Sequence, residues 1–180
     1  MLLATCIIAI AGIVSALAAV VSTIAVRNGI TEQTKNFEKQ ATAYRLSLSV
    51  EAAFRLEEFF DSPKFQNRRS EAASALLNQK DEAEAEYVFD FFDTVGLFVR
   101  LGALGEDIAY SMFFHWINLY WRAGKRYIGG KQKEVSQVWK DFEWLFERVS
   151  EVERKRHPDS EDLTMPAERL KSQLQEEYDL

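Results

Sequence analysis

Cysteine, histidine, proline and glycine are all scarce in this chain of 180 residues, and each scarcity narrows the class of protein. The single cysteine, Cys6, cannot form an intrachain disulfide, which excludes a disulfide-stapled fold. Three prolines and eight glycines disfavour both a turn-rich β protein and a disordered chain. Aromatic residues, at 13% of the chain, supply ample apolar area for a core.

The motifs of common catalytic and metal centres are also missing. A di-iron bundle needs Glu-x-x-His, but methionine stands three places before His115, and arginine three places before His157. Two histidines and one cysteine are too few ligands for a zinc site. No phosphate-binding Gly-x-x-x-x-Gly-Lys loop and no Gly-x-Ser-x-Gly nucleophile elbow occurs. We therefore expect no enzyme, no cofactor, no metal and no small-molecule substrate.

An enzyme of unrecognised type stays open as an alternative, with few residues to carry its chemistry. A run of acidic residues between positions 82 and 93 could supply paired carboxylates, but such a run is more typical of a solvated helix face. The one histidine among aromatic neighbours is more typical of a half-buried structural residue. The acidic run comprises Glu82, Glu84, Glu86, Asp90 and Asp93, and the candidates for the enzyme alternative are Glu86, Asp90, Asp93 and His115.

Negative charge is concentrated at the end of the chain. The net charge is −6, and the segment from Pro158 to Leu180 contains seven acids and two bases. The preceding domain is nearly balanced and lacks the concentrated basic face that nucleic-acid binding needs. We therefore predict an acidic tail over residues 158–180 and no nucleic-acid partner.

The first 26 residues carry the most informative absence, because no charged side chain occurs from Leu2 to Val26. As a helix these 25 residues would measure about 38 Å, and a bilayer core is about 30 Å thick. Ala16-Leu17-Ala18 resembles a signal-peptidase site, but no basic residue precedes it and the apolar run continues to Val26. We predict an uncleaved transmembrane helix over residues 2–26, with the lipid bilayer as partner.

Basic residues follow this segment at Arg27, Lys35, Lys39 and Arg45, while none precedes it. Because positive flanks stay in the cytoplasm, we predict a single-pass protein of the inner membrane, with its N-terminus outside and its C-terminal domain cytoplasmic.

Small residues form a stripe along the predicted span. Such stripes let transmembrane helices approach closely, which predicts a homo-oligomer, although alanine-rich spans also produce them by chance. Ala11, Ser15, Ala19 and Thr23 recur every four positions, and Gly12 and Ala16 lie beside them. The predicted helix–helix interface is Ala11, Gly12, Ser15, Ala16 and Ala19.

Spacings of three and four in the apolar residues predict helices throughout the remaining chain. A helix over 31–60 is expected to present one apolar face, and Ser62-Pro63 to cap the next helix. A helix over 82–101 should stop at Gly102. Gly129-Gly130 should close the helix that opens at Gly105, and a last long helix should cover 132–156. The expected face is Phe37, Ala41, Tyr44, Leu48, Ala52, Leu56 and Phe59.

Together these patterns predict an all-α protein, in which one N-terminal transmembrane helix precedes a cytoplasmic antiparallel bundle of four or five helices. The predicted segments are the span at 2–26, a juxtamembrane helix at 27–60, the bundle at 61–157, and the tail at 158–180 with a short amphipathic helix near 166–177.

A mixture of bases and aromatic residues near position 124 forms a candidate interaction patch. The same residues also suit a packed helix end with basic residues at its C-terminus. A membrane-facing or partner-facing patch is the functional alternative, and stacking on nucleic acid is the least favoured. The patch comprises Trp121, Arg122, Lys125, Arg126 and Tyr127.

The layout resembles a family of bacterial single-span membrane proteins catalogued as domain of unknown function 4760. The residues that carry the resemblance are Val88-Phe89-Asp90-Phe91-Phe92-Asp93, Phe98-Val99-Arg100-Leu101-Gly102, and the stretch from Tyr110 through Tyr120-Trp121. The similar layout covers most of Leu2–Val149. The resemblance implies a bacterial inner-membrane setting and supplies no activity.

The sequence thus predicts a membrane-anchored, non-enzymatic helical module that binds a protein partner or a second copy of itself. The alternative is a membrane-acting regulator or effector that oligomerises through its span.

Overall fold

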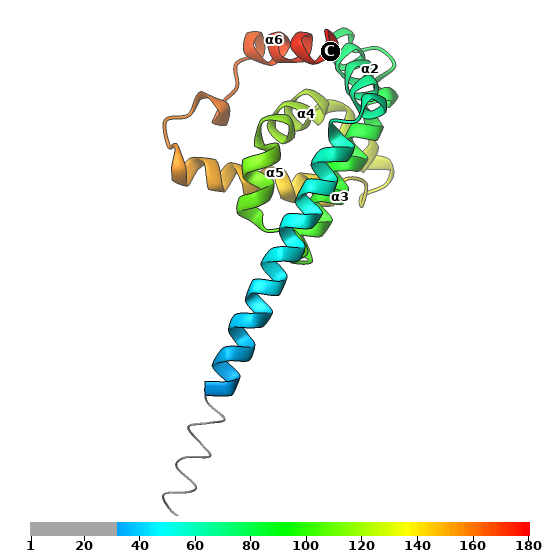
Figure 1. Ribbon diagram of the computed structural model, residues 1–180. Coiled ribbons are helices and arrows are strands. Elements are labelled where there is room, and N and C mark those ends of the chain that lie inside the picture. Colours follow the sequence, from blue (N-terminus) through cyan, green and yellow to red (C-terminus); the bar gives the residue numbers. More distant parts are fainter. Residues whose placement is uncertain (1–31) are drawn as a thin grey trace, which may run out of the picture. The chain divides into compact units, whose positions relative to one another are not determined.

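The computed structural model describes residues 32–180, and every regular element in that range is a helix, as the sequence predicts (Figure 1). The chain divides into two compact units, Met1–Arg45 and Leu46–Leu180. An N-terminal helix occupies residues 32–60. It is followed by α2 (Pro63–Asn78), η1 (Glu82–Ala85), α3 (Glu86–Arg100), α4 (Glu106–Glu134), α5 (Lys140–Arg156), η2 (Glu161–Leu163) and α6 (Ala167–Tyr178).

Helix α3 is central to the bundle and packs against α2, α4 and α5. Its Phe92 is fully buried and stacks on Phe142 of α5 with 5.3 Å between ring centroids. Gly96 lets the two helices meet, because a Cβ there would lie 2.2 Å from the backbone oxygen of Asp141. The apolar stripe of α3 that the sequence shows therefore forms the centre of the core.

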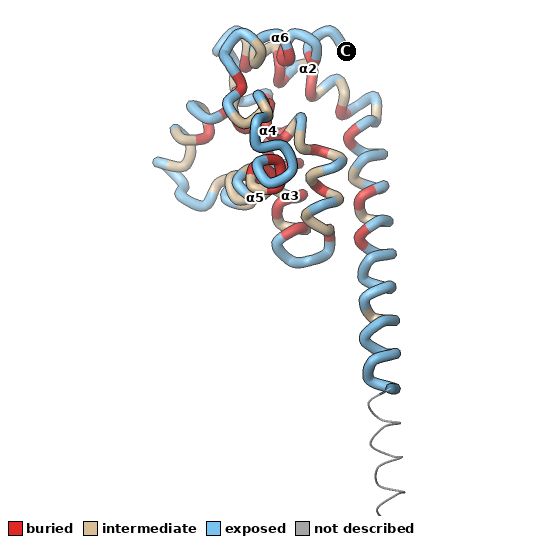
Figure 2. Tube along the Cα trace, turned by 90° about the vertical axis from the view of Figure 1, so that its left-hand side faces the viewer, coloured by how far each residue is buried: buried red, intermediate tan, exposed pale blue. Residues whose placement is uncertain are grey.

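The N-terminal helix uses a different face from the predicted one to join the bundle. Ser49, Ala53 and Phe60 are buried, and they share one stripe with the partly buried Leu56. Figure 2 shows these buried positions recurring along one side of the helix. The predicted face is wrong at Leu48 and Phe59, which stay 46% and 53% exposed.

The physical reason is a small polar residue that the hydrophobic pattern ignores. The Ser49 hydroxyl oxygen accepts a hydrogen bond of 2.7 Å from the backbone N–H of Gly105. That bond satisfies a free donor at the start of α4 and brings the helix close to the α3–α4 turn. The buried stripe consequently runs one position later than the pattern of large apolar residues indicates.

Two predicted helix boundaries are confirmed. Ser62 precedes Pro63 at the start of α2, and its side chain accepts from the N–H of Phe65. Gly102 adopts a φ of +71°, a left-handed conformation that glycine tolerates, just after α3 ends.

The predicted break at Gly129-Gly130 is wrong, because α4 continues to Glu134 and α5 begins only at Lys140. A glycine inside a helix costs only about 1 kcal/mol relative to alanine. The continuing turns are held by Ile128, which is buried, and by Lys131, which pairs with Glu86 of α3 at 3.2 Å. Tertiary contacts therefore outweigh the two glycines.

The amphipathic helix predicted near the C-terminus is confirmed as α6, which packs on α2 (Figure 1). It buries Gln173, Leu174 and Glu177, so the acidic tail joins the compact unit.

Between residues 32 and 180, no helix combines the length and apolar character needed to cross a membrane. The predicted span at 2–26 lies outside the described residues, as does the predicted interface of Ala11, Gly12, Ser15, Ala16 and Ala19.

Candidate interaction groove

An open groove of about 500 Å³ lies where the end of the N-terminal helix meets α2 and α3. Three aromatic rings line its base: Phe59–Phe65 centroids are 4.9 Å apart, and Phe65–Phe91 centroids 5.1 Å. We call it the aromatic groove; its lining is Leu56, Phe59, Ser62, Lys64, Phe65, Arg68, Tyr87, Asp90, Phe91 and Thr94.

Two aromatic side chains of the groove remain half exposed. Phe65 and Phe91 are buried, but Phe59 and Tyr87 keep 53% and 54% of their surface accessible. Exposed large apolar side chains gathered around a hollow are typical of a binding surface, whereas single scattered ones are ordinary. This makes the groove the strongest candidate site in the described part of the chain.

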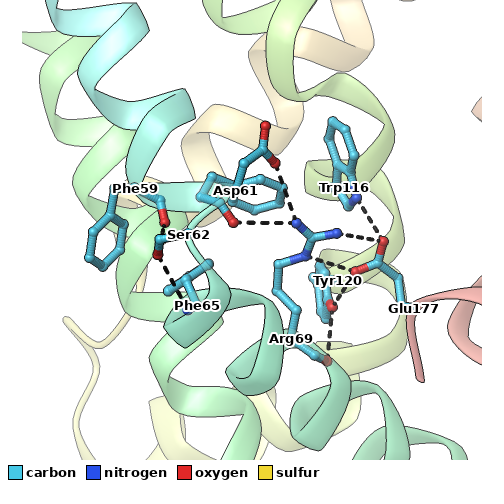
Figure 3. Close-up of polar contacts among 9 residues, drawn as sticks. Phe59, Asp61, Ser62, Phe65, Arg69, Trp116, Tyr120 and Glu177 are labelled. Atoms are coloured by element: carbon cyan, nitrogen blue, oxygen red, sulfur yellow. Dashed lines mark hydrogen bonds and ion pairs between the residues drawn. The ribbon is translucent and has the colours of Figure 1, made fainter. Parts of the chain in front are cut away.

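The turn between the N-terminal helix and α2 positions these rings. Ser62 donates its hydroxyl to the carbonyl oxygen of Phe59 at 2.6 Å, and its oxygen accepts from the N–H of Phe65 at 3.4 Å (Figure 3). Pro63 then occupies the first turn of α2, where a missing N–H costs nothing. The turn therefore fixes Phe59 and Phe65 on the two sides of the groove's base.

Charged residues stand at the rim. Arg68 stacks over the Tyr87 ring at 4.4 Å and pairs with Glu71 at 3.0 Å, so its charge is already shared. Asp90 accepts a hydrogen bond of 2.7 Å from the indole N–H of Trp139. Lys64 is exposed and has no ion-pair partner within residues 32–180. The groove thus combines an apolar base with one cation available to a ligand.

The other side of α2 holds a buried ion pair (Figure 3). Arg69 is 4% exposed and donates to both carboxylate oxygens of Glu177, at 2.9 and 3.0 Å. Trp116 and Tyr120 of α4 also donate to that carboxylate, at 2.9 and 3.1 Å. The guanidinium lies 4.2 Å above the ring of Phe60. We call this set the Arg69 clamp.

The Arg69 clamp joins α6 to α2 and α4. Its carboxylate receives four donated hydrogen bonds, and a buried charge is stable only when it is paired this fully. Burial raises the pKa of Tyr120 well above its usual value, and the nearby Glu177 charge adds to that rise. Tyr120 therefore remains a hydrogen-bond donor, and the clamp suits structural support better than chemistry.

The structure divides the predicted interaction patch, because Trp121, Arg122 and Lys125 line one surface hollow while the other two residues contact different elements. Trp121 is buried and stacks on Phe146. Arg122 donates to the Leu163 carbonyl at 2.6 Å, and Lys125 is exposed in the same hollow.

The other two members of that set contact different elements. Arg126 pairs with Glu82 at 2.9 Å, and Tyr127 donates to Glu86 at 2.5 Å. The Tyr127 hydrogen bond lowers the pKa of Glu86, and the nearby Lys131 lowers it further.

The acidic candidates on α3 meet donors of α4 and α5 rather than one another. Glu86 accepts from Tyr127, and Asp90 from Trp139. Asp93 caps α5, where its Oδ1 accepts from the N–H groups of Asp141 and Phe142, both at 2.9 Å. Burial raises the pKa of Asp93.

Glu82 and Glu84 likewise serve as ion-pair partners. Glu82 pairs with Arg126 at 2.9 Å, and Glu84 lies 3.7 Å from Arg68. His115 is exposed rather than half-buried, so that expectation is wrong. It lines a separate hollow on α4 that none of the five acids reaches.

The sequence contains a signal for the groove that helical periodicity does not reveal. Phe59 and Phe60 are adjacent, and neighbouring helical positions are turned by about 100°, so the two rings leave the helix on different sides. Phe60 enters the core, which leaves Phe59 for the surface. Two adjacent aromatic residues at the end of a helix, just before Ser-Pro, therefore indicate an aromatic side chain at the surface.

A family model described as Domain of unknown function (DUF4760) matches residues 6–149. No curated protein and no solved structure matches the chain. Every residue that lines the aromatic groove falls within the matched range, whereas α6 and Glu177 lie beyond it.

Proposed function

The chain belongs to the family described as Domain of unknown function (DUF4760), and from that premise we propose that it is a membrane-tethered, non-enzymatic module that binds a partner protein in the aromatic groove. The tether is the uncharged segment 2–26. The observation that carries the proposal is the exposure of Phe59 and Tyr87 around an apolar hollow.

The chemistry of the groove defines the partner. Its volume of about 500 Å³ accommodates one or two apolar side chains. A helix that inserts an aliphatic or aromatic anchor is the usual occupant of such grooves. Lys64, exposed at the rim, favours a carboxylate beside that anchor. The partner is therefore an amphipathic helix with an apolar anchor and an adjacent acid.

A dye with the same chemistry tests the groove directly. Anilinonaphthalene sulfonate joins aromatic rings to one anionic group, so its fluorescence should rise when it binds the full chain in detergent. Phe59→Ser should abolish most of that rise, and Lys64→Gln should weaken it. Phe54→Ser is the matched control, because Phe54 is 63% exposed on the same helix but does not line the groove.

The partner is then identified by a photo-reactive amino acid placed at Tyr87 in living cells. Tyr178, which is 47% exposed on α6 and lies outside the groove, is the control position. A protein captured only from position 87 should compete with the dye when purified. Equal dye binding by wild type, Phe59→Ser and Phe54→Ser would refute the groove as the site.

The tether and its orientation are tested separately. An anchored chain resists extraction from membranes by alkaline carbonate, and removal of residues 2–26 should release it. An alkaline phosphatase fused to the C-terminus should stay inactive, because the proposal places the domain in the cytoplasm. An active fusion would contradict the proposed orientation without affecting the groove.

A further inference from the structure

The first half of the N-terminal helix carries an apolar stripe that is separate from both the core and the groove. Phe37 and Tyr44 are 72% and 66% exposed, and Leu48 is 46% exposed. With Ala41 between them, these residues are spaced four, three and four apart along one helix. Alternating steps of three and four form the seam of a coiled coil.

The charges around this stripe suit a second copy of the same helix. No charged residue lies on the stripe from Phe37 to Leu48. In a parallel, in-register pair, Glu38 would face Gln33 and Arg45 would face Gln40, because residues flanking the seam meet across it with an offset of five. No like charges are opposed there, so pairing meets no electrostatic penalty.

The uncharged stripe ends after Leu48. The next two seam positions are Glu51 and Arg55, which in such a pair would each meet an identical charge. From Ser49 onward the helix instead buries a different side against the bundle, beginning with Ser49 and Ala53. The exposed seam and the buried stripe thus occupy successive lengths of one helix.

In the opposite direction the sequence continues the seven-residue spacing. Ile30, Thr23 and Ala16 precede Phe37 at intervals of seven. Thr23 and Ala16 also belong to the small-residue stripes of the predicted span. Both patterns share one heptad spacing, but Arg27 stands at a seam position between them, so we infer pairing only for the stripe from Phe37 to Leu48.

We infer that a second copy of this chain covers the stripe formed by Phe37, Ala41, Tyr44 and Leu48, and that the two helices run parallel and in register. The parallel direction depends on the proposed tether, because two chains anchored in one membrane leave it in the same direction. The pairing itself does not depend on the aromatic groove.

Site-specific crosslinking of the full chain in its membrane tests this pairing. The single native cysteine is removed by Cys6→Ser, and single cysteines are then introduced by Phe37→Cys, Ala41→Cys, Tyr44→Cys and Leu48→Cys. After mild oxidation, each should give a disulfide-linked dimer, because identical seam positions face each other in a parallel pair.

Leu46→Cys and Lys39→Cys are the controls. Leu46 is a leucine that is 59% exposed only two residues from Leu48, but it points away from the seam. The four seam positions should give several-fold more dimer than these two. Equal yields at all six positions, or no dimer from the seam, would overturn the inference.

Two further outcomes separate the alternatives. Dimer formed only between chains carrying Phe37→Cys and chains carrying Leu48→Cys would overturn the parallel register in favour of an antiparallel one. Seam cysteines protected from a thiol reagent without any dimer would overturn the second copy in favour of another partner. If alkaline carbonate extracts the chain from the membrane, the proposed tether is wrong. The crosslinking experiment is then repeated on the extracted protein, where the same pattern of dimer yields tests the pairing.

Discussion

Removing the Glu177 carboxylate should destabilise the fold severely, because the buried Arg69 would then keep only Asp61 as a counter-charge, at 3.8 Å and on a side chain that is 60% exposed. Arg69 and Glu177 are 4% and 7% exposed. Glu177→Ala leaves two N–H groups of Arg69 and the indole N–H of Trp116 without their acceptor, while Tyr120 keeps the Arg69 carbonyl at 3.2 Å. Breaking a buried ion pair on one side typically costs about 3–5 kcal/mol. We expect a loss of that size in the free energy of unfolding.

Urea unfolding of the full chain in detergent, followed by tryptophan fluorescence, measures this loss. Glu58→Ala is the control, because Glu58 pairs with Arg55 at 3.3 Å with both side chains about three-quarters exposed. Exposed pairs contribute about 0.2–1 kcal/mol. The double variant Arg69→Met with Glu177→Leu should recover most of the stability, since apolar residues often replace a buried ion pair without net cost.

The result that would refute this reasoning is a Glu177→Ala variant no less stable than Glu58→Ala. Hydrogen exchange adds a local test, because the clamp predicts faster exchange in α6 before the rest of the bundle opens. Unchanged protection of α6 in a destabilised variant would mean that Leu174 and its apolar neighbours, rather than the clamp, hold this helix.

Three further predictions concern other parts of the bundle. Gly124→Ala should lower the free energy of unfolding by about 1–3 kcal/mol, because the new Cβ would lie 2.4 Å from the Phe89 ring. Gly129→Ala has open space around it and should raise the free energy of unfolding by up to about 1 kcal/mol. Urea unfolding measures both changes. Burial raises the pKa of Asp93, so its contribution to stability is full below its unfolded pKa and falls as the pH rises through the folded value. Relative to Asp93→Asn, the wild type should therefore gain stability on acidification below pH 7, and an unchanged difference across that range would contradict it. Burial, with the Glu153 hydrogen bond, raises the pKa of Tyr110 to about 12. Its contribution to stability should hold below about pH 10 and fall toward pH 12, and the phenolate absorbance step near pH 12 should shrink in Tyr110→Phe.

The sequence predicts the helical elements well where local chemistry decides the outcome. Ser62-Pro63 and Gly102 mark real boundaries, because a cap and a left-handed glycine act through the backbone alone. Gly129 and Gly130 mislead, because the contacts that carry α4 past them come from Glu86, more than forty residues away. A local rule cannot include such a partner.

The candidate site was harder to predict, because it depends on which of several apolar residues the core leaves out. Trp121 looks like part of an exposed basic patch, yet it stacks in the core on Phe146. Phe59 looks like a core residue, yet it lines a groove at the surface. Periodicity finds an apolar face but not its partner, so it cannot separate a core stripe from a binding surface.

Helix α2 connects the aromatic groove to the Arg69 clamp through two adjacent arginines. Arg68 stacks on Tyr87 at the groove rim, while Arg69, one helical position later, points to Glu177 on the other side. Loosening the clamp should therefore loosen the groove, since one helix supports both. If so, Glu177→Ala weakens dye binding even though Glu177 does not line the groove, and the Arg69→Met, Glu177→Leu pair restores it. Dye binding that follows stability across these variants would assign the clamp a positioning role, and undiminished dye binding in Glu177→Ala would show that the groove holds its form without α6.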